Sequence, residues 1–440
     1  MYTRKNILTV AIGSAVLFSS SSFAQLEEIV VSGTLQSNIV NSMSPPLSIR
    51  DTPQAVAITT AEEIRDRGFR ELGDIVRYTA GVNQSQGEGH RDSVVFRGVR
   101  STADFYRDGL RDDVQYYRSL YNVEQVEVLR GPNALLFGRG GTGGLINRVT
   151  KKAVVGQSGG SFDVGADSFG AFDVAADYNI QTGANSALRI NAHRDSLENH
   201  RNLFDGQRVG FNPTFRIELD SNTRLDLSYE HANHERFIDR GIPTENGVPV
   251  EALADITFGT GDLNVQRLTA DIFKGSLSRE LSSGSRLNVN LQYDTFDKLY
   301  QNLYASGYDG TLVTMDGYKD PTARENLFFD TNFITEFDTG SVSHTMSIGG
   351  QIVSTENQNH RFNTFWSTTS DDNEVFNVTN PMNFSVNSAG VATSVDFTSD
   401  LNNSTSSSID VTSVYIQDQI NIGDNLILML GGRIDNFDIT

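Results

Sequence analysis

The side chains that could carry out chemistry are few and scattered in this sequence. Its 440 residues include no cysteine, which excludes a thiolate metal site and a disulfide framework. The seven histidines, among them His90, His231 and His234, share no spacing typical of a metal site. Neither the H-E-x-x-H motif nor the P-loop motif occurs. The residue types therefore give no support for an enzyme.

One glycine-rich segment, Gly138-Arg139-Gly140-Gly141-Thr142-Gly143, matches the dinucleotide-binding pattern G-x-G-x-x-G. A dinucleotide site needs that turn between a strand and a helix, whereas the residues that follow, Leu145 to Thr150, alternate like a strand. We therefore expect a closely packed structural turn here and no phosphate-binding loop.

Composition limits the partners and the environment of the chain. Acidic residues outnumber basic ones by 55 to 35, which gives a formal charge of −20. A chain this acidic repels nucleic acid. With 20% charged residues and a mean hydropathy of −0.32, it does not resemble a helical membrane protein. A membrane β-barrel stays compatible, because its strands place alternate polar residues in the lumen.

The first 24 residues are typical of a secretory signal peptide. Arg4 and Lys5 give a basic start, and Ile7 to Phe18 is mostly apolar. In Ser22-Phe23-Ala24, small residues occupy the −3 and −1 positions of a cleavage site. The apolar stretch is too short for a spanning helix, which needs about 20 residues. We expect an exported chain that begins at Gln25, and the lack of cysteine suits a bacterial envelope protein.

Residues 25–50 form a predicted flexible leader with one strand-like stretch. Acidic residues, a β-branched triplet and a glycine follow one another from Glu27 to Gly33. Such a strand could be captured by the sheet edge of a partner protein. It could equally be the first edge strand of the next domain, and spacing alone leaves both alternatives open.

Residues 51–155 are predicted to form a compact α/β domain. Thr60 is a suitable N-cap for a helix from Ala61 to Arg67, which ends at Gly68, and a second helix is expected from Glu71 to Tyr78. The predicted strands include Val56 to Thr59, Ser93 to Val99, Phe105 to Gly109 and Val123 to Pro132.

From Gly160 to the end, apolar and polar residues alternate in one strand after another, so that residues 156–440 form a separate β domain. In one example, Leu287, Val289 and Leu291 lie between charged or amide residues. The predicted short turns are 181–185, 220–223 and 281–285, and the predicted long connections are 231–262 and 295–325. Short turns on one side and long loops on the other favour a transmembrane barrel over a soluble sandwich.

The pattern gives roughly 10 to 12 strands. An open sheet in a membrane would leave its edge groups without hydrogen bonds, and a domain of the size of residues 51–155 could block only a wide barrel. We therefore expect that the sequence is part of a longer one.

Several short motifs recur in one known family. They are Asp51-Thr52-Pro53-Gln54-Ala55-Val56, Phe96-Arg97-Gly98, Tyr106-Arg107-Asp108-Gly109, Val126-Glu127-Val128-Leu129-Arg130-Gly131-Pro132, Gly143-Gly144-Leu145-Ile146-Asn147-Arg148-Val149-Thr150-Lys151, Tyr415-Ile416-Gln417-Asp418-Gln419 and Gly431-Gly432-Arg433-Ile434-Asp435. Through them the chain resembles the TonB-dependent outer-membrane receptors, in particular those for ferric siderophores. The resemblance covers nearly the whole mature chain.

The resemblance implies a fold and an energy source. Residues 51–155 would be an α+β plug inside an antiparallel transmembrane β-barrel of about 22 strands, of which about half are present here. Glu28-Ile29-Val30-Val31-Ser32 would be the TonB box, the strand that a periplasmic energy transducer pulls. The leader is too short for the additional signalling domain that some members carry.

The resemblance also assigns roles to particular side chains. Arg97 and Arg130, by default surface arginines, would belong to a plug–barrel ion-pair cluster whose glutamate partners lie beyond Thr440. The turns at Gly87 to Asp92 and Arg100 to Ala103 would bind ligand. The expected ligand-binding residues are Arg91, Arg100, Tyr116 and Tyr117. Arginines and flat aromatic rings suit an oxygen-rich anionic iron chelate, slightly favouring a catecholate over a hydroxamate. Packing of Tyr116 and Tyr117 inside the plug is the alternative.

The function implied is energised import of ferric siderophores by a monomer in the outer membrane of a Gram-negative bacterium. The expected partners are a TonB-type transducer, a ferric siderophore and outer-membrane lipid. No cofactor is expected, and iron would be coordinated by the siderophore and not by protein atoms. A passive porin or a β-barrel adhesin is the alternative; a porin would lack the plug.

Overall fold

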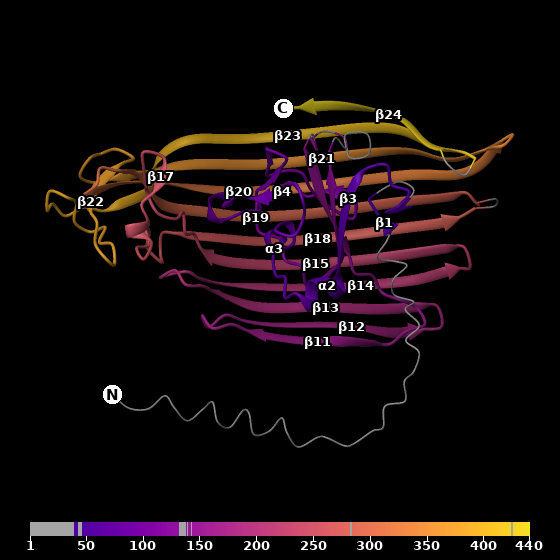
Figure 1. The fold of residues 1–440 in the computed structure, drawn as a ribbon, viewed down its shortest axis with the longest axis horizontal. Coiled ribbons are helices and arrows are strands. Elements are labelled where there is room, and N and C mark those ends of the chain that lie inside the picture. Colours follow the sequence, from indigo (N-terminus) through magenta and orange to yellow (C-terminus); the bar gives the residue numbers. More distant parts are fainter. Residues whose placement is uncertain are drawn as a thin grey trace, which may run out of the picture. The chain divides into compact units, whose positions relative to one another are not determined.

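The fold was analysed in a computed structural model that describes residues 39–42, 46–131, 138, 140–141, 143–281, 284–423 and 426–440. All of these residues fall in one compact unit. The predicted signal peptide and the predicted TonB box lie outside the described residues. Figure 1 shows a broad sheet of long strands, with the elements of residues 51–155, called the plug unit from here on, drawn across it.

The broad sheet is antiparallel and contains 12 strands, which confirms the predicted number. Eleven strands follow one another in chain order, each paired with the next. They are β11 (Gly159–Ala166), β12 (Phe172–Gly183), β13 (Ser186–Glu198), β14 (Asp205–Asp220), β15 (Thr223–Phe237), β18 (Val265–Glu280), β19 (Arg286–Tyr308), β20 (Leu312–Thr339), β21 (Val342–Trp366), β23 (Val395–Ile422) and β24 (Leu426–Ile439). The short β22 (Glu374–Asn377) pairs with the first residues of β20, Leu312 to Met315.

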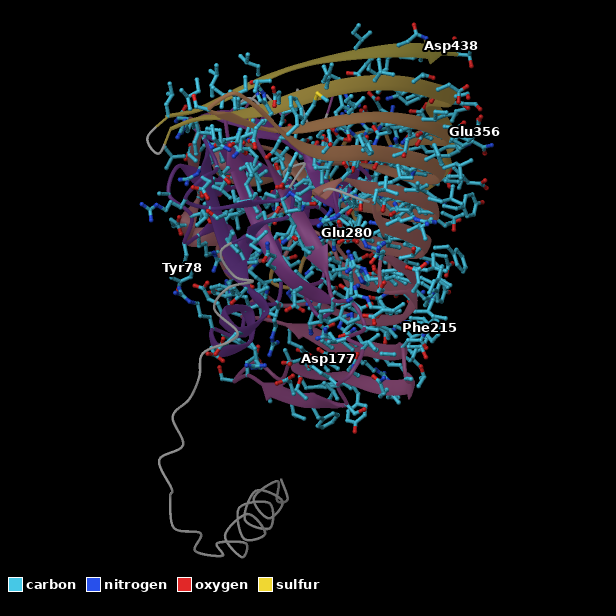
Figure 2. The ribbon with its side chains drawn as sticks, turned by 90° about the vertical axis from the view of Figure 1, so that its right-hand side faces the viewer. Tyr78, Asp177, Phe215, Glu280, Glu356 and Asp438 are labelled. Carbon is cyan, nitrogen blue, oxygen red and sulfur yellow. The ribbon has the colours of Figure 1, made fainter. Side chains whose placement is uncertain are left out.

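The two faces of this sheet differ in polarity because successive side chains of a strand point to opposite faces. On β15, Leu227 is 45% exposed on one face, whereas Glu230 on the other face is 7% exposed. Large apolar residues such as Phe273 and Leu291 are likewise exposed on the first face. In Figure 2, Phe215 lies on the side of the sheet away from the plug unit. The sheet therefore presents an apolar face to its surroundings and a polar face to the plug unit.

The two ends of the sheet have different connections. At the turn end, residues such as 184–185, 221–222 and 340–341 join neighbouring strands. At the loop end, the long connections span residues 238–264 and 367–394. They carry β16 (Thr244–Glu245), β17 (Val248–Pro249), the 3-10 turn η3 (Glu251–Leu253) and β22. Figure 1 shows β17 and β22 gathered at this end.

The prediction of a long connection at 295–325 is wrong. Strands β19 and β20 continue through this segment and meet at a three-residue turn, residues 309–311. The cause is that polar residues such as Asp297 and Lys298 occupy both faces of the hairpin in this segment. The alternating pattern then fades although the strand continues.

An apolar cluster ties the loop end together. Its buried members are Leu253, Ile256, Phe258, Leu303, Val313, Met315, Trp366, Phe376 and Phe397. Trp366, the only tryptophan of the chain, has no exposed surface, and its ring centroid is 5.0 Å from that of Phe376. The long loops therefore pack as a small core of their own.

The described residues of the plug unit form two small sheets and two short helices. A five-stranded sheet has the order β3 (Ala55–Thr60), β9 (Val123–Arg130), β10 (Gly144–Thr150), β7 (Phe105–Arg107) and β8 (Leu110–Arg111). A three-stranded sheet contains β4 (Val82–Gln84), β5 (Val94–Phe96) and β6 (Val99–Ser101). The helices are α2 (Ala61–Asp66) and α3 (Leu72–Val76), and the turn η2 spans Gly87–Gly89. A hairpin of β1 (Ile39–Val40) and β2 (Leu47–Ser48) precedes the unit.

Helix α2 begins where the sequence predicts. The hydroxyl oxygen of Thr60 accepts a hydrogen bond from the backbone N–H of Glu63 at 3.2 Å, and Gly68 adopts a left-handed conformation just after the helix. Among the described residues, no helix combines the length and apolarity needed to cross a bilayer. The plug unit instead packs around a core that includes Ile75, Phe96 and Val126.

Candidate functional site

Polar contacts hold the plug unit against the polar face of the sheet. The ion pairs across this interface include Arg107–Glu230 at 3.0 Å, Lys274–Asp108 at 3.2 Å, Arg324–Asp113 at 3.1 Å, Lys151–Asp177 at 3.0 Å and Arg208–Glu71 at 3.0 Å. Buried ion pairs add little net stability compared with apolar packing. Removing one partner is nevertheless strongly destabilising, because the other charge stays buried without a counter-charge. The ion pairs therefore fix the position of the plug unit, and one buried apolar cluster adds to the contact by joining Val114 and Tyr116 to Ala232, Leu268, Ala270, Ile272 and Phe296 of the sheet.

Glu71 of the plug unit contacts two strands of the sheet. It forms the N-cap of α3, and its carboxylate accepts hydrogen bonds from Arg208 on β14 at 3.0 Å and from Arg236 on β15 at 3.1 Å. Burial raises the pKa of Glu71, but Arg236 and Arg208 more than offset this effect and hold the pKa below its usual range. Glu71 is therefore a carboxylate at neutral pH.

A buried polar network makes the centre of the plug unit rigid. The Asp112 carboxylate accepts hydrogen bonds from Arg118 at 2.9 Å, Arg148 at 2.7 Å and the Tyr116 hydroxyl at 2.9 Å. Arg118 has no exposed surface, and Tyr116 is 5% exposed. This position favours the packing alternative for Tyr116, which also contacts Phe296 of the sheet.

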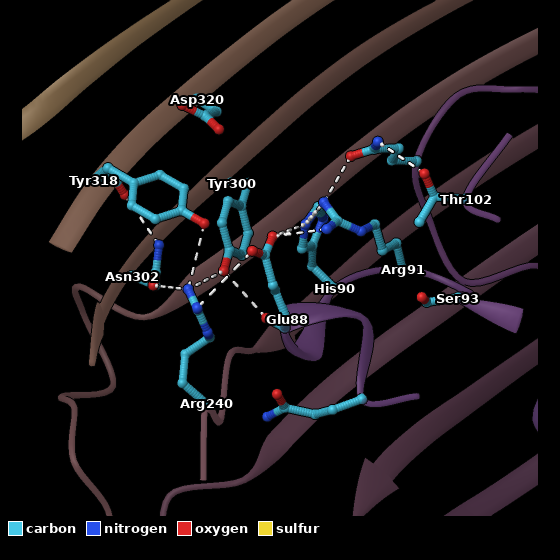
Figure 3. Close-up of polar contacts among 12 residues, drawn as sticks. Glu88, His90, Arg91, Ser93, Thr102, Arg240, Tyr300, Asn302, Tyr318 and Asp320 are labelled. Atoms are coloured by element: carbon cyan, nitrogen blue, oxygen red, sulfur yellow. Dashed lines mark hydrogen bonds and ion pairs between the residues drawn. The ribbon is translucent and has the colours of Figure 1, made fainter. Parts of the chain in front are cut away.

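The turn η2 of the plug unit contacts the loop end of the sheet (Figure 3). Gly87, Glu88 and Gly89 are all left-handed, with φ of 63°, 58° and 76°. Glycine adopts this conformation freely, but it is rare for glutamate. A Cβ on Gly89 would lie 2.7 Å from the carbonyl oxygen of Asp239. Glycine at this position thus permits close approach to the loop after β15.

Two side chains of the plug unit lie next to the Glu88 carboxylate. Arg91 forms an ion pair with it at 2.9 Å, and the His90 ring lies 3.7 Å away. Together with Arg240, they lower the pKa of Glu88 to about 2, so that the carboxylate is ionised at physiological pH. Burial lowers the pKa of His90 to about 3, which makes this imidazole neutral. It stacks on Tyr300 at 3.8 Å between ring centroids.

The sheet contributes arginine and tyrosine to the same place. Arg240 donates hydrogen bonds to the Tyr300 hydroxyl at 3.1 Å, to Asn302 Oδ1 at 2.9 Å and to the Tyr318 hydroxyl at 3.3 Å, and it lies 3.9 Å from Glu88. Its guanidinium is 4.5 Å from the ring centroid of Tyr304. We call Glu88, His90, Arg91, Arg240, Tyr300 and Tyr318 the apex cluster (Figure 3). Its arginines and aromatic rings can hold a flat, oxygen-rich anion.

The structure places the predicted ligand-binding residues at different positions. Arg91 lies in the apex cluster, and Arg100 is exposed on β6. Tyr117 lies near the turn η2, and the guanidinium of Arg236 is 4.2 Å from the Tyr117 ring centroid. The Tyr117 hydroxyl donates a hydrogen bond to the backbone oxygen of Gln86 at 3.1 Å. Their roles in ligand binding stay predictions.

A polar cavity of about 390 Å³ opens next to the apex cluster. Its lining includes Glu71, Tyr117, Arg201, Phe204, Arg236 and Asp239. Arg201 and Asp239, from two different loops, form an ion pair at 2.6 Å. Charged and aromatic groups therefore line the space between the plug unit and the loops.

Arg97 and Arg130 lie close to other parts of the plug unit. Arg130 donates hydrogen bonds to the backbone oxygens of Ala80 at 2.7 Å and Ala55 at 3.4 Å. Arg97 is left-handed, with φ of 47°, and its side chain lies over Gly81. Since their glutamate partners were expected beyond Thr440, the ion-pair role of both arginines stays a prediction.

The hairpin β1–β2 docks on the plug unit through Glu127, a buried carboxylate on β9. Glu127 accepts hydrogen bonds from the backbone N–H groups of Asn41 at 2.5 Å and Ser42 at 2.9 Å. The side chains of Gln125, at 2.7 Å, and Asn147, at 3.0 Å, also donate to it. The apolar side of the hairpin packs on Tyr106, Leu129 and Leu145. The chain next to the predicted TonB box is thus fastened to the central sheet of the plug unit.

Neither a metal centre nor a nucleotide site is evident in the part of the chain that the structure describes. No group of three or more histidine, aspartate or glutamate side chains there could hold a metal ion. Strand β10 and no helix begins at Gly144, just after the glycine-rich segment, and Gly140 is closely packed, since a Cβ there would lie 2.4 Å from Asp104 Oδ1. Residues 156–160 match G-x-S-x-G, but this segment opens the edge strand β11 and not a helix.

Arg240, Tyr300 and Tyr318 of the apex cluster were not among the predicted site residues, because they lie in the segments predicted as long connections, 231–262 and 295–325. The tyrosines at 300, 304, 308 and 318 were the available signal. Tyr300, Tyr304 and Tyr318 converge on Arg240, which depends on the pairing of β19 with β20 that no local motif specifies.

Two family profiles match the chain. The TonB-dependent Receptor Plug Domain matches residues 48–145, and the TonB dependent receptor-like beta-barrel matches residues 210–440. Among curated relatives, the probable TonB-dependent receptor BfrD of Bordetella pertussis is 29% identical over 78% of this chain and 49% of its own length. The probable TonB-dependent siderophore receptor PiuA of Acinetobacter baumannii is 25% identical over 99% of this chain and 63% of its own length.

Solved structures share the fold. The siderophore receptor PiuA from Acinetobacter baumannii superposes with a TM-score of 0.79 at 23% identity, covering 89% of this chain and 59% of that one. The ferric-catecholate import receptor Fiu from E. coli K12 superposes with a TM-score of 0.76 at 22% identity, covering 91% and 61%. The chain thus spans about half to two thirds of the length of these relatives. With plug and barrel profiles both matched, this chain belongs to the TonB-dependent receptor family.

Proposed function

We propose that this protein imports ferric siderophores across the outer membrane of a Gram-negative bacterium, driven by a TonB-type transducer that pulls on the leader. Family membership supports a receptor and not an enzyme. The names of two relatives, a siderophore receptor and a ferric-catecholate import receptor, support the ligand class. The exposed apolar face of the sheet suits membrane lipid.

The observation that carries the proposal is the attachment of the leader to the plug. Asn41 and Ser42 are hydrogen-bonded to Glu127 on β9, and β9 is hydrogen-bonded to both β3 and β10. A force applied at residues 28–32 would reach the plug sheet after about ten residues of chain, a span of roughly 35 Å when extended. The plug meets the barrel strands through ion pairs, which water can replace when the plug moves.

The leader provides the test. Deletion of residues 26–34 is expected to abolish uptake of radiolabelled ferric catecholate by intact cells, because the transducer loses its strand. The signal peptide and the plug stay intact, so the amount of protein in the outer membrane and the binding of the chelate should not change. Uptake that continues at the normal rate after this deletion would contradict the energised mechanism.

A further inference from the structure

We infer that the Glu88 carboxylate occupies the binding position of an anionic group of the ligand, and that an anionic chelate displaces it from Arg91 and Arg240. The inference rests on the proposed function and deepens it, because it assigns a charge to the preferred chelate. The side-chain carboxylate of Glu88 acts as an internal competitor that selects against weakly charged ligands.

The first support is the balance of charge and exposure around Glu88. Two guanidinium groups approach one carboxylate, and the Arg91 and Arg240 side chains are only 20% and 17% exposed. Glu88 is 37% exposed and is therefore the member of the ion-pair group most open to solvent. An incoming anion would meet the carboxylate first and would find the two arginines behind it.

The second support is an unused donor. Arg91 Nε is buried and has no hydrogen-bond acceptor within the described part of the chain. Arg91 Nη1 donates to Gln115 at 2.8 Å, and Nη2 faces Glu88 at 2.9 Å. A buried donor without an acceptor is costly, and a ligand with several oxygens could satisfy both Nε and Nη2. The Glu88 carboxylate satisfies only one of them.

The third support is that the backbone of the turn is fixed while the side chain is not. Tyr300 donates a hydrogen bond to the backbone oxygen of Glu88 at 3.1 Å, and Gln86 donates to the backbone oxygen of Asp239 at 2.9 Å. Gly89 packs directly against Asp239. Only the Glu88 side chain, with its freely rotating bonds, can leave without moving the plug. Exchange of anions therefore needs no rearrangement of the turn.

The aromatic residues determine what kind of anion fits. Tyr300 and Tyr318 meet edge to face at 5.5 Å, and the guanidinium of Arg361 lies 4.1 Å from the Tyr318 ring centroid. Arg361 is paired with Asp320 and is thus neutralised, unlike Arg91 and Arg240 once Glu88 has left. Flat rings beside two arginines suit an aromatic ligand with negative oxygens, which is the chemistry of a ferric catecholate.

The test compares Glu88→Gln with the unaltered protein in detergent micelles, by equilibrium binding of radiolabelled chelates. The probes are a trianionic ferric tris-catecholate and a neutral ferric tris-hydroxamate. Without the competing charge, affinity for the catecholate should rise about fivefold, the effect of one partly exposed charge pair, and affinity for the hydroxamate should stay unchanged. Arg91→Gln should weaken catecholate binding about tenfold.

Glu245→Gln, which removes an exposed carboxylate from the neighbouring loop, is the matched control and should change neither affinity. Unfolding temperatures of all variants verify that they are folded. If the unaltered protein binds chelates and Glu88→Gln leaves catecholate affinity unchanged or lower, the inference is overturned while the proposed function stands. If neither chelate binds to the unaltered protein or to Glu88→Gln, both fail.

Discussion

Glu71 joins helix α3 of the plug to barrel strands β14 and β15, and its ionisation links the plug–barrel contact to pH. Arg236 and Arg208 hold its pKa below the ordinary value of 4.5. A carboxyl group whose pKa is lower in the folded state binds fewer protons there than in the unfolded state. Its contribution to stability is therefore complete above about pH 4.5 and is lost as the pH falls towards the folded-state pKa.

We predict that Glu71→Gln lowers the free energy of unfolding by about 2 kcal/mol at neutral pH, the usual value of hydrogen bonds to a charged group. Chemical denaturation of both proteins across a pH series would measure this. The difference should shrink as the pH falls below about 4.5, because the unaltered protein then loses the same charge. Glu62→Gln, on the exposed face of α2, is the control and should show no difference. A difference that does not depend on pH would show that the charge of Glu71 is irrelevant.

At the scale of elements, the hairpin β1–β2 depends on the buried carboxylate of Glu127. Glu127→Gln replaces one acceptor oxygen by an NH₂ group that faces the backbone N–H of Asn41 or Ser42. We expect this to destabilise docking of the hairpin by about 1–3 kcal/mol. Because the chain has no cysteine, a spin label on Ile49→Cys would report the mobility of the hairpin specifically. The label should become more mobile in Glu127→Gln.

The matched control for this experiment lies on the same strand. Glu124 is also on β9 but points to Arg189 of the barrel at 3.6 Å, and its side chain is 44% exposed. Glu124→Gln should leave the mobility of the label unchanged. Equal mobility in the two variants would contradict the role assigned to Glu127.

Much of the architecture was predictable from the sequence because it follows from local rules. The cap at Thr60 and the alternation in strands such as β12 and β15 depend on neighbouring residues, and both predictions are confirmed. The ends of the longest strands were not predictable, since β19 and β20 continue where the alternation fades. The position of Glu88 beside Arg240 and Tyr300 depends on contacts between residues more than 150 positions apart. Single-sequence patterns carry no information on such contacts.

For the whole molecule, ion pairs, hydrogen bonds and one small apolar cluster around Tyr116 and Phe296 join the plug to the barrel, while the plug has a larger apolar core of its own and the barrel an exposed apolar face. Removing the plug should therefore leave the barrel strands folded. We predict that the full-length gene without residues 51–155 gives a protein that still inserts, makes the outer membrane permeable to small solutes and no longer supports energised uptake. Antibiotic sensitivity and uptake of radiolabelled chelate would measure these two effects. Unchanged permeability would favour a passive porin.

Trp366 packs under the long loops and is therefore an intrinsic fluorescence probe of their position. Its indole is enclosed by Phe376 and the rest of the loop cluster, so its emission should be blue-shifted while the loops stay closed. Any opening of the loops would admit water to the ring and shift the emission to the red. Stopped-flow fluorescence could time this movement without a label, once any tryptophan outside these 440 residues is replaced by phenylalanine.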